Sequence, residues 1–169
     1  MHINSPEKQN KKYFLRLTEA QMILTMILIF SLLFLPVLSC TDTETDMTIK
    51  LYLCETAKIS FTYPTSALLY LLCGFFTSAH AGITSTGRKK RVLPRIFFSV
   101  GTVFFIAASL IFIISTEHIS KSSSECTVIQ PGIGFWTAFI SGFMSQTLSF
   151  CKITLTGCQY LKKHGKYQN

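Results

Sequence analysis

The chain has 169 residues, of which 49% are hydrophobic and 14% charged, and its formal net charge at pH 7 is +8. A basic balance can signal nucleic-acid binding, but here the positive residues occupy short stretches beside apolar segments, with no separate folded domain to carry them. Composition and charge therefore argue against a nucleic-acid partner and favour an integral membrane protein.

Four uncharged apolar segments follow one another along the chain, at about residues 20–39, 62–84, 96–115 and 132–151. A helix of about twenty residues rises about 30 Å, which matches the hydrocarbon thickness of a bilayer. Backbone groups inside lipid must form their hydrogen bonds within each segment, which favours helices. The predicted fold class is an all-α membrane protein, a bundle of four transmembrane helices.

The charges between the segments predict the orientation of the bundle. Thirteen basic and two acidic residues lie in residues 1–19, in the second connection and in the tail after residue 151. The other two connections carry three basic and six acidic residues. Because short cytoplasmic loops retain Lys and Arg, both termini are predicted to be cytoplasmic.

This orientation divides the chain into a cytoplasmic tail at 1–19, a membrane domain at 20–151 and a second cytoplasmic tail at 152–169. The alternative is that the first segment is a cleaved signal sequence, since it ends in PVLSC at Cys40. The apolar run is longer than a signal core, and cleavage would place the two termini on opposite sides. We therefore expect the first helix to be retained.

The second connection contains the basic run Arg88, Lys89, Lys90 and Arg91. On the cytoplasmic side such a run anchors the topology and attracts anionic lipid headgroups, at about 1 kcal/mol per residue. The sequence therefore predicts contact with anionic lipids as well as with the bilayer interior.

The six cysteines divide by predicted side. Cys40, Cys54 and Cys126 lie at the outer face, where a Cys40–Cys54 bridge, a Cys54–Cys126 bridge or three free thiols are all compatible with the sequence. Cys151 and Cys158 lie at the inner end of the fourth helix beside basic residues, a setting in which palmitoylation is common.

Small residues at helical spacing mark two of the segments as packing elements. In lipid, close backbone approach through small side chains supplies much of the attraction between helices. The second segment offers one such strip and the fourth a wider one with hydroxyl side chains, and Gln146 beside it can form an interhelical hydrogen bond. The predicted helix-association residues are Gly74, Ser78, Gly82, Gly134, Ala138, Ser141, Gly142, Ser145, Gln146 and Ser149.

No Asp or Glu lies in any of the four segments, and His80, near the inner end of the second, has no acidic partner there. Proton-coupled transport and intramembrane catalysis both need such groups. The sequence therefore predicts no enzyme activity, no cofactor and no metal site.

The arrangement resembles small four-helix membrane proteins of the claudin and peripheral-myelin-protein type and of the MARVEL type. The shared features are inner termini, a basic inner loop, outer cysteines and a short tail. Residues 51–54, Leu-Tyr-Leu-Cys, stand where claudins have an aromatic-then-cysteine element. The first outer loop lacks a tryptophan and looks too short for the extracellular sheet by which claudins form barriers, so the resemblance does not imply paracellular sealing.

A chain that is nearly all membrane bundle is expected to act as an accessory or scaffold protein. It would associate laterally with itself or with other membrane proteins through the small-residue strips of the second and fourth segments, in the plasma membrane or an endomembrane. The alternative is a subunit of a small channel or transporter that forms on oligomerisation.

Overall fold

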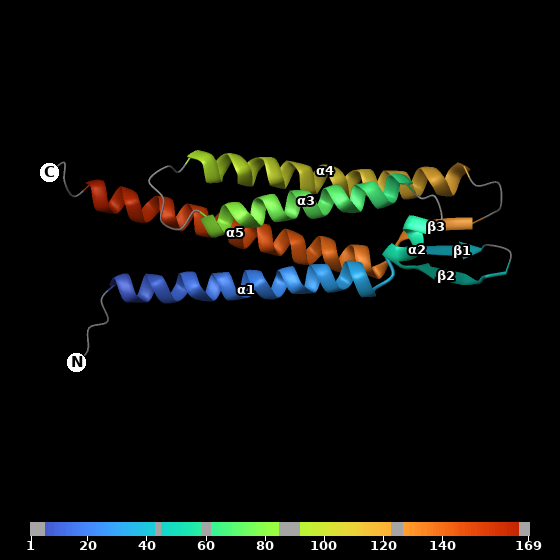
Figure 1. Ribbon diagram of the computed structural model, residues 1–169, viewed down its shortest axis with the longest axis horizontal. Coiled ribbons are helices and arrows are strands. Elements are labelled where there is room, and N and C mark those ends of the chain that lie inside the picture. Colours follow the sequence, from blue (N-terminus) through green and yellow to red (C-terminus); the bar gives the residue numbers. More distant parts are fainter. Residues whose placement is uncertain (1–5, 43–44, 59–61, 85–91, 123–126, 166–169) are drawn as a thin grey trace.

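The computed structural model describes residues 6–42, 45–58, 62–84, 92–122 and 127–165. Its long helices run side by side along one axis, and a small sheet lies at one end (Figure 1). The elements are α1 (Pro6–Phe34), β1 (Leu38–Asp42), β2 (Thr48–Leu51), α2 (Leu53–Lys58), α3 (Thr62–Thr84), α4 (Val92–Ser122), β3 (Thr127–Pro131) and α5 (Ile133–Gly165). The chain is mainly helical, as predicted.

Among the described residues, α1, α3 and α4 each contain a stretch long and apolar enough to cross a membrane. The helix α3 has the bounds predicted for the second segment. In contrast, α1 ends at Phe34 rather than continuing to Ser39. Pro36 causes this early end, because the residue before a proline disfavours the helical conformation and the proline itself donates no backbone hydrogen bond.

The connection between the first and second predicted segments, which was not expected to form strands, forms a strand pair. Strand β1 pairs antiparallel with β2 on one side and with β3 on the other, giving the order β2-β1-β3. Leu38 lies opposite both Leu51 and Pro131. The first and third connections between the predicted segments are therefore joined in one sheet.

Local capping fixes the turns around this sheet. Asp46, with a φ of 55°, adopts the left-handed conformation that Asp tolerates better than most residues. Thr45 Oγ1 donates to Asp42 Oδ2 at 2.7 Å. At the start of α2, the Tyr52 N–H donates to Glu55 Oε2 at 3.0 Å, an arrangement that satisfies an N–H left open at a helix start.

The helices pack in two closely associated pairs, α3 with α4 and α1 with α5, and α3 also contacts α5. Glycines set the closest approaches. A Cβ added to Gly74 would lie 2.6 Å from the backbone nitrogen of Phe105, and one added to Gly101 would lie 2.7 Å from the carbonyl oxygen of Gly74. The backbones of α3 and α4 therefore touch at this crossing.

Stacked phenylalanines fill the space between α4 and α5. The ring centroids of Phe112 and Phe135 lie 4.3 Å apart, and those of Phe105 and Phe139 lie 5.7 Å apart. At the sheet end, the N–H groups of Gly132 and Gly134 donate to the carbonyls of Val37 and Pro36. These bonds attach the start of α5 to the end of α1.

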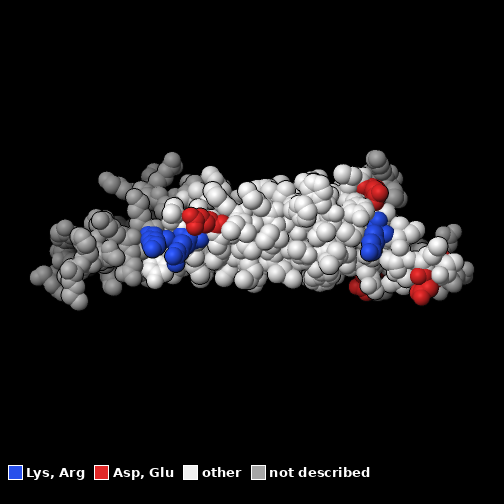
Figure 2. All heavy atoms as spheres, turned by 90° about the horizontal axis from the view of Figure 1, so that it is seen from below, with Lys and Arg blue, Asp and Glu red and all other residues white. Residues whose placement is uncertain are grey.

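On the face drawn in Figure 2, a broad central region carries no Lys, Arg, Asp or Glu, and charges lie toward both ends. Helix α1 begins and helix α5 ends at the end opposite the sheet (Figure 1). The charged side chains described nearest that end are Lys12, Arg16, Glu19 and Arg95, and those near the sheet are Asp42, Asp46, Lys50, Glu55 and Glu117.

Candidate functional site

A chain of buried polar side chains joins α1 to α5 in the half of the bundle away from the sheet. Lys152 Nζ donates to Gln21 Oε1 at 2.5 Å, and Gln21 Nε2 donates to Ser149 Oγ at 2.9 Å. The Ser149 hydroxyl in turn donates to the carbonyl of Ser145 at 3.2 Å. All four residues are buried, so the bonds connect the two helices away from solvent.

Lys152 is placed here because α5 does not end at residue 151. The helix continues to Gly165, past the end of the fourth predicted segment, and the Lys152 side chain is fully buried against α1. Its ammonium also lies 5.7 Å from the ring centroid of Phe14. Among the described residues Lys152 has no carboxylate partner, so an amide oxygen and an aromatic face are what stabilise its charge.

Next to these hydrogen-bonded side chains lie polar atoms that have no hydrogen-bond partner among the described residues. They are the Ser145 hydroxyl and both polar atoms of the Gln146 side-chain amide, all buried. Buried polar groups are normally hydrogen-bonded, in many cases to an ordered water. The hydrogen bond predicted for Gln146 is not formed in this structure.

All ten predicted helix-association residues are buried inside the chain. Gly74 faces α4, whereas an added Cβ on Gly82 would lie 2.7 Å from the Ser149 hydroxyl of α5. On α5, Gly134 faces the carbonyls of Ser31 and Leu35, and Gly142 faces the Phe105 ring. The two strips are therefore covered by helices of the same molecule, and a lateral partner would contact a different surface.

The outer cysteines do not form the bridges considered above. Cys40 on β1 and Cys54 on α2 are both free thiols. Partial burial of Cys40 in the central strand raises the pKa of its thiol. Cys54 is exposed, and so is Cys151 on α5.

Three further predictions fall on parts of the chain that are not described. Cys126 and the basic run 88–91 lie outside the described residues, and the side chain of Cys158 is likewise not described. Their proposed roles in a disulfide, in lipid contact and in palmitoylation stay predictions.

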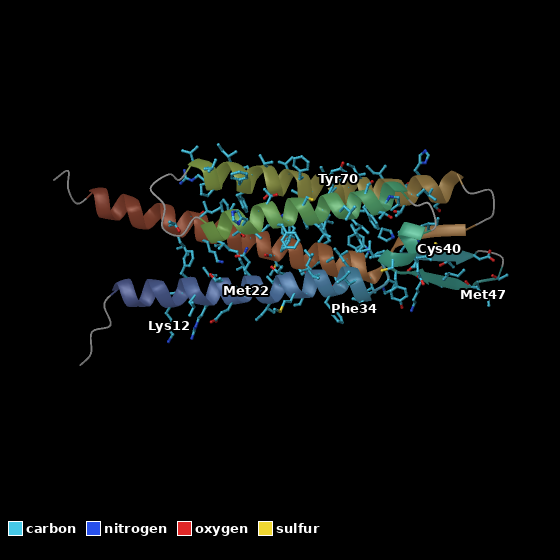
Figure 3. The ribbon with its side chains drawn as sticks, in the orientation of Figure 1. Lys12, Met22, Phe34, Cys40, Met47 and Tyr70 are labelled. Carbon is cyan, nitrogen blue, oxygen red and sulfur yellow. The ribbon has the colours of Figure 1, made fainter. Side chains whose placement is uncertain are left out.

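A second polar feature lies on the outside of the bundle, along α3. The residues Ser66, Tyr70, Cys73, Thr77 and His80 follow one another at spacings of four and three, and we name this row the α3 stripe. Tyr70, Cys73 and His80 are exposed, and Ser66 and Thr77 are partly so. The Tyr70 side chain, which is labelled in Figure 3, is 57% exposed, and no hydrogen bond joins its hydroxyl to the described residues.

Sequence reasoning missed both polar features. Gln21 lies at the second position of the first predicted segment and Lys152 directly follows the fourth, and neither was among the predicted contact residues. The signal for the α3 stripe was its spacing of four and three, which differs from the four-residue spacing of the glycines beside it.

No protein-family model, curated protein or solved structure matches this chain. What the arrangement can do is therefore argued from its own residues. The hydrogen bonds that join Lys152, Gln21 and Ser149 can hold α1 and α5 in register. The α3 stripe presents hydrogen-bonding groups to the surroundings of the bundle.

Proposed function

We propose that this protein is a four-span membrane protein with cytoplasmic termini that associates laterally with itself or with other membrane proteins, as an accessory or scaffold. The observation that carries the proposal is the α3 stripe. Lipid tails offer no hydrogen bonds, so an exposed Tyr70 hydroxyl in a membrane segment is better satisfied by a neighbouring protein helix.

The fourth span is part of this proposal. Helix α5 has no stretch as apolar as those that qualify α1, α3 and α4 as candidate spans, and its buried side is lined with glycine, serine and a glutamine. Its exposed side is bulky and apolar, with Ile133, Trp136, Ile140, Phe143 and Met144. A helix whose polar side faces its own bundle can lie in lipid, which supports a fourth crossing.

The orientation is supported by the distribution of charge in the described residues. The end that holds the start of α1 and of α4 carries Lys12, Arg16 and Arg95, whereas acidic side chains predominate at the sheet end. The positive end corresponds to the cytoplasm. The exposed Cys151 then lies on the cytoplasmic half of α5, which supports its proposed palmitoylation.

The claudin-type resemblance is retained as a proposal about fold. It is supported by the strand pair β1–β2 within the first proposed outer connection. The sheet has three strands, so the proposal does not extend to barrier formation.

A second candidate function, a subunit of a small channel or transporter, is favoured by the buried polar atoms of Ser145 and Gln146. These atoms lie near Lys152 on the same helix, and a polar seam inside a bundle can hold water. Ion and solute flux into liposomes that contain the purified protein tests this candidate, and selective conductance would favour it over the scaffold.

Proximity labelling from the C-terminal tail tests lateral association. We expect Cys73→Trp, which fills the centre of the α3 stripe, to change the set of labelled neighbours. The matched control is Val103→Trp, which adds the same bulk to an exposed position on α4. Unchanged neighbours in the Cys73→Trp variant would argue against the proposal.

A further inference from the structure

The spacing of the α3 stripe is that of a helix–helix seam. Its residues recur at steps of four and three, so they follow a 3.5-residue repeat. Such a repeat keeps one row of side chains facing a partner helix that crosses at about 20°. The Gly74 side of α3 is already occupied by α4, whereas the stripe faces outward.

The depth of the stripe makes contact with lipid alone unfavourable. The apolar stretch of α3 runs from Pro64 to Ile83. Tyr70 lies six residues into it, or about 9 Å at 1.5 Å per residue, and Cys73 lies near its middle. The Thr77 hydroxyl donates to the carbonyl of Cys73 at 2.7 Å, but the Tyr70 hydroxyl and the Cys73 thiol bond to nothing else in the described residues. An unbonded hydroxyl at this depth is costly.

We propose that the partner of the α3 stripe is the same stripe on a second copy of this chain, in a parallel pair related by a two-fold axis along the membrane normal. This inference rests on the proposed lateral association and names its partner. Around such an axis each residue meets its own equivalent, so the surface must complement itself.

The chemistry of the stripe meets this requirement. Hydroxyl, thiol and imidazole groups each donate and accept hydrogen bonds, so Tyr70 can bond to Tyr70 of the second copy without a different partner residue. No Asp, Glu, Lys or Arg lies in the stripe, and identical residues therefore meet without strong repulsion. Pairing of two such stripes would give the Tyr70 hydroxyl the hydrogen-bond partner that lipid does not offer.

Cysteine cross-linking in native membranes tests the pair directly. In a variant that keeps only Cys73, we expect mild oxidation to give a disulfide-linked dimer, because seam residues of a parallel pair lie close to their equivalents. The control is a cysteine-free variant with Val103→Cys, which is also exposed but lies on α4. Equal cross-linking at both positions would indicate random collision and overturn the pair.

The affinity of the pair is measured by energy transfer between labelled copies diluted in liposomes. Tyr70→Phe, which removes only the hydroxyl, should weaken association by about threefold to twentyfold, the range of one interhelical hydrogen bond. Tyr13→Phe is the matched control, since Tyr13 on α1 is also 57% exposed. Equal affinities of the two variants would overturn the role given to Tyr70.

A photoactivatable cross-linker at position 70 in cells separates this inference from the proposed function. Cross-linking to a second copy supports both. Cross-linking to a different membrane protein alone would overturn the self-association while lateral association stands. Cross-linking to lipid alone would overturn both.

Discussion

The ammonium of Lys152 on α5 donates a hydrogen bond to the side-chain oxygen of Gln21 on α1, at 2.5 Å, and both side chains are buried. Gln21 also donates to Ser149, so one glutamine connects a buried cation to a hydroxyl on the same neighbouring helix. Because Lys152 has no carboxylate partner among the described residues, Gln21 is central to the stability of this contact.

We expect Gln21→Leu to lower the free energy of unfolding by about 2 kcal/mol, because the Lys152 charge then loses its acceptor inside the bundle. Lys152→Met should cost only about 1 kcal/mol, since an apolar side chain of similar length fills the same space without a charge. Thermal unfolding in detergent measures both. The double variant should be less destabilised than the sum of the two single changes, and strict additivity would show that the pair does not interact.

The crossing of α3 and α4 gives a second prediction. The Cβ of Gly74→Ala would lie 2.6 Å from the Phe105 nitrogen and 2.8 Å from the Gly101 carbonyl oxygen. Both are backbone atoms, so the helices must separate, and we expect a loss of about 2 kcal/mol in the free energy of unfolding. Ala107→Leu, at an exposed position on α4, is the control and should change stability by less than about 0.5 kcal/mol. Equal stability of Gly74→Ala and the native protein would contradict the close crossing.

The existence of four long helices could be predicted because twenty uncharged apolar residues have one conformation that satisfies the backbone in lipid. The residues at which the helices end were harder to predict. Pro36 was a usable signal for the end of α1. The apolar run itself continues through Leu38, which lies in β1, so hydropathy alone places the end of the helix too late. Strand pairing between β1 and β3 brings together residues about ninety positions apart, and no local pattern specifies that contact.

The small-residue strips were recognised, but not which helix covers each of them. Gly101 was not among the predicted association residues, yet it faces Gly74 at the close crossing of α3 and α4. Which helix packs against a strip depends on the three-dimensional arrangement of all four helices. The spacing of small residues describes only the helix on which they lie. Lys152 was assigned to a tail for a related reason, because a lysine after an apolar run normally reaches water along its flexible stem.

The two outer thiols should differ in reactivity. Burial raises the pKa of the Cys40 thiol, so at neutral pH a smaller fraction of it is thiolate, the reactive form. In variants that keep a single cysteine, we expect Cys40 to react with a maleimide more slowly than the exposed Cys54. Below its pKa, the Cys40 rate should rise about tenfold per pH unit. Equal rates at pH 7 would contradict the burial of Cys40 in the central strand.

The orientation of the bundle predicts which residues are reachable from outside a cell. Met47, beside the β1–β2 turn, is 70% exposed at the sheet end, and Lys12 is exposed at the opposite end. In a cysteine-free variant, we expect a membrane-impermeant maleimide to label Met47→Cys on intact cells if the protein resides in the plasma membrane, or in sealed vesicles with the lumenal face outward. Lys12→Cys should be labelled in the same samples only after permeabilisation, because the proposed orientation places the basic end in the cytoplasm. The opposite pattern would invert the bundle and place the sheet in the cytoplasm.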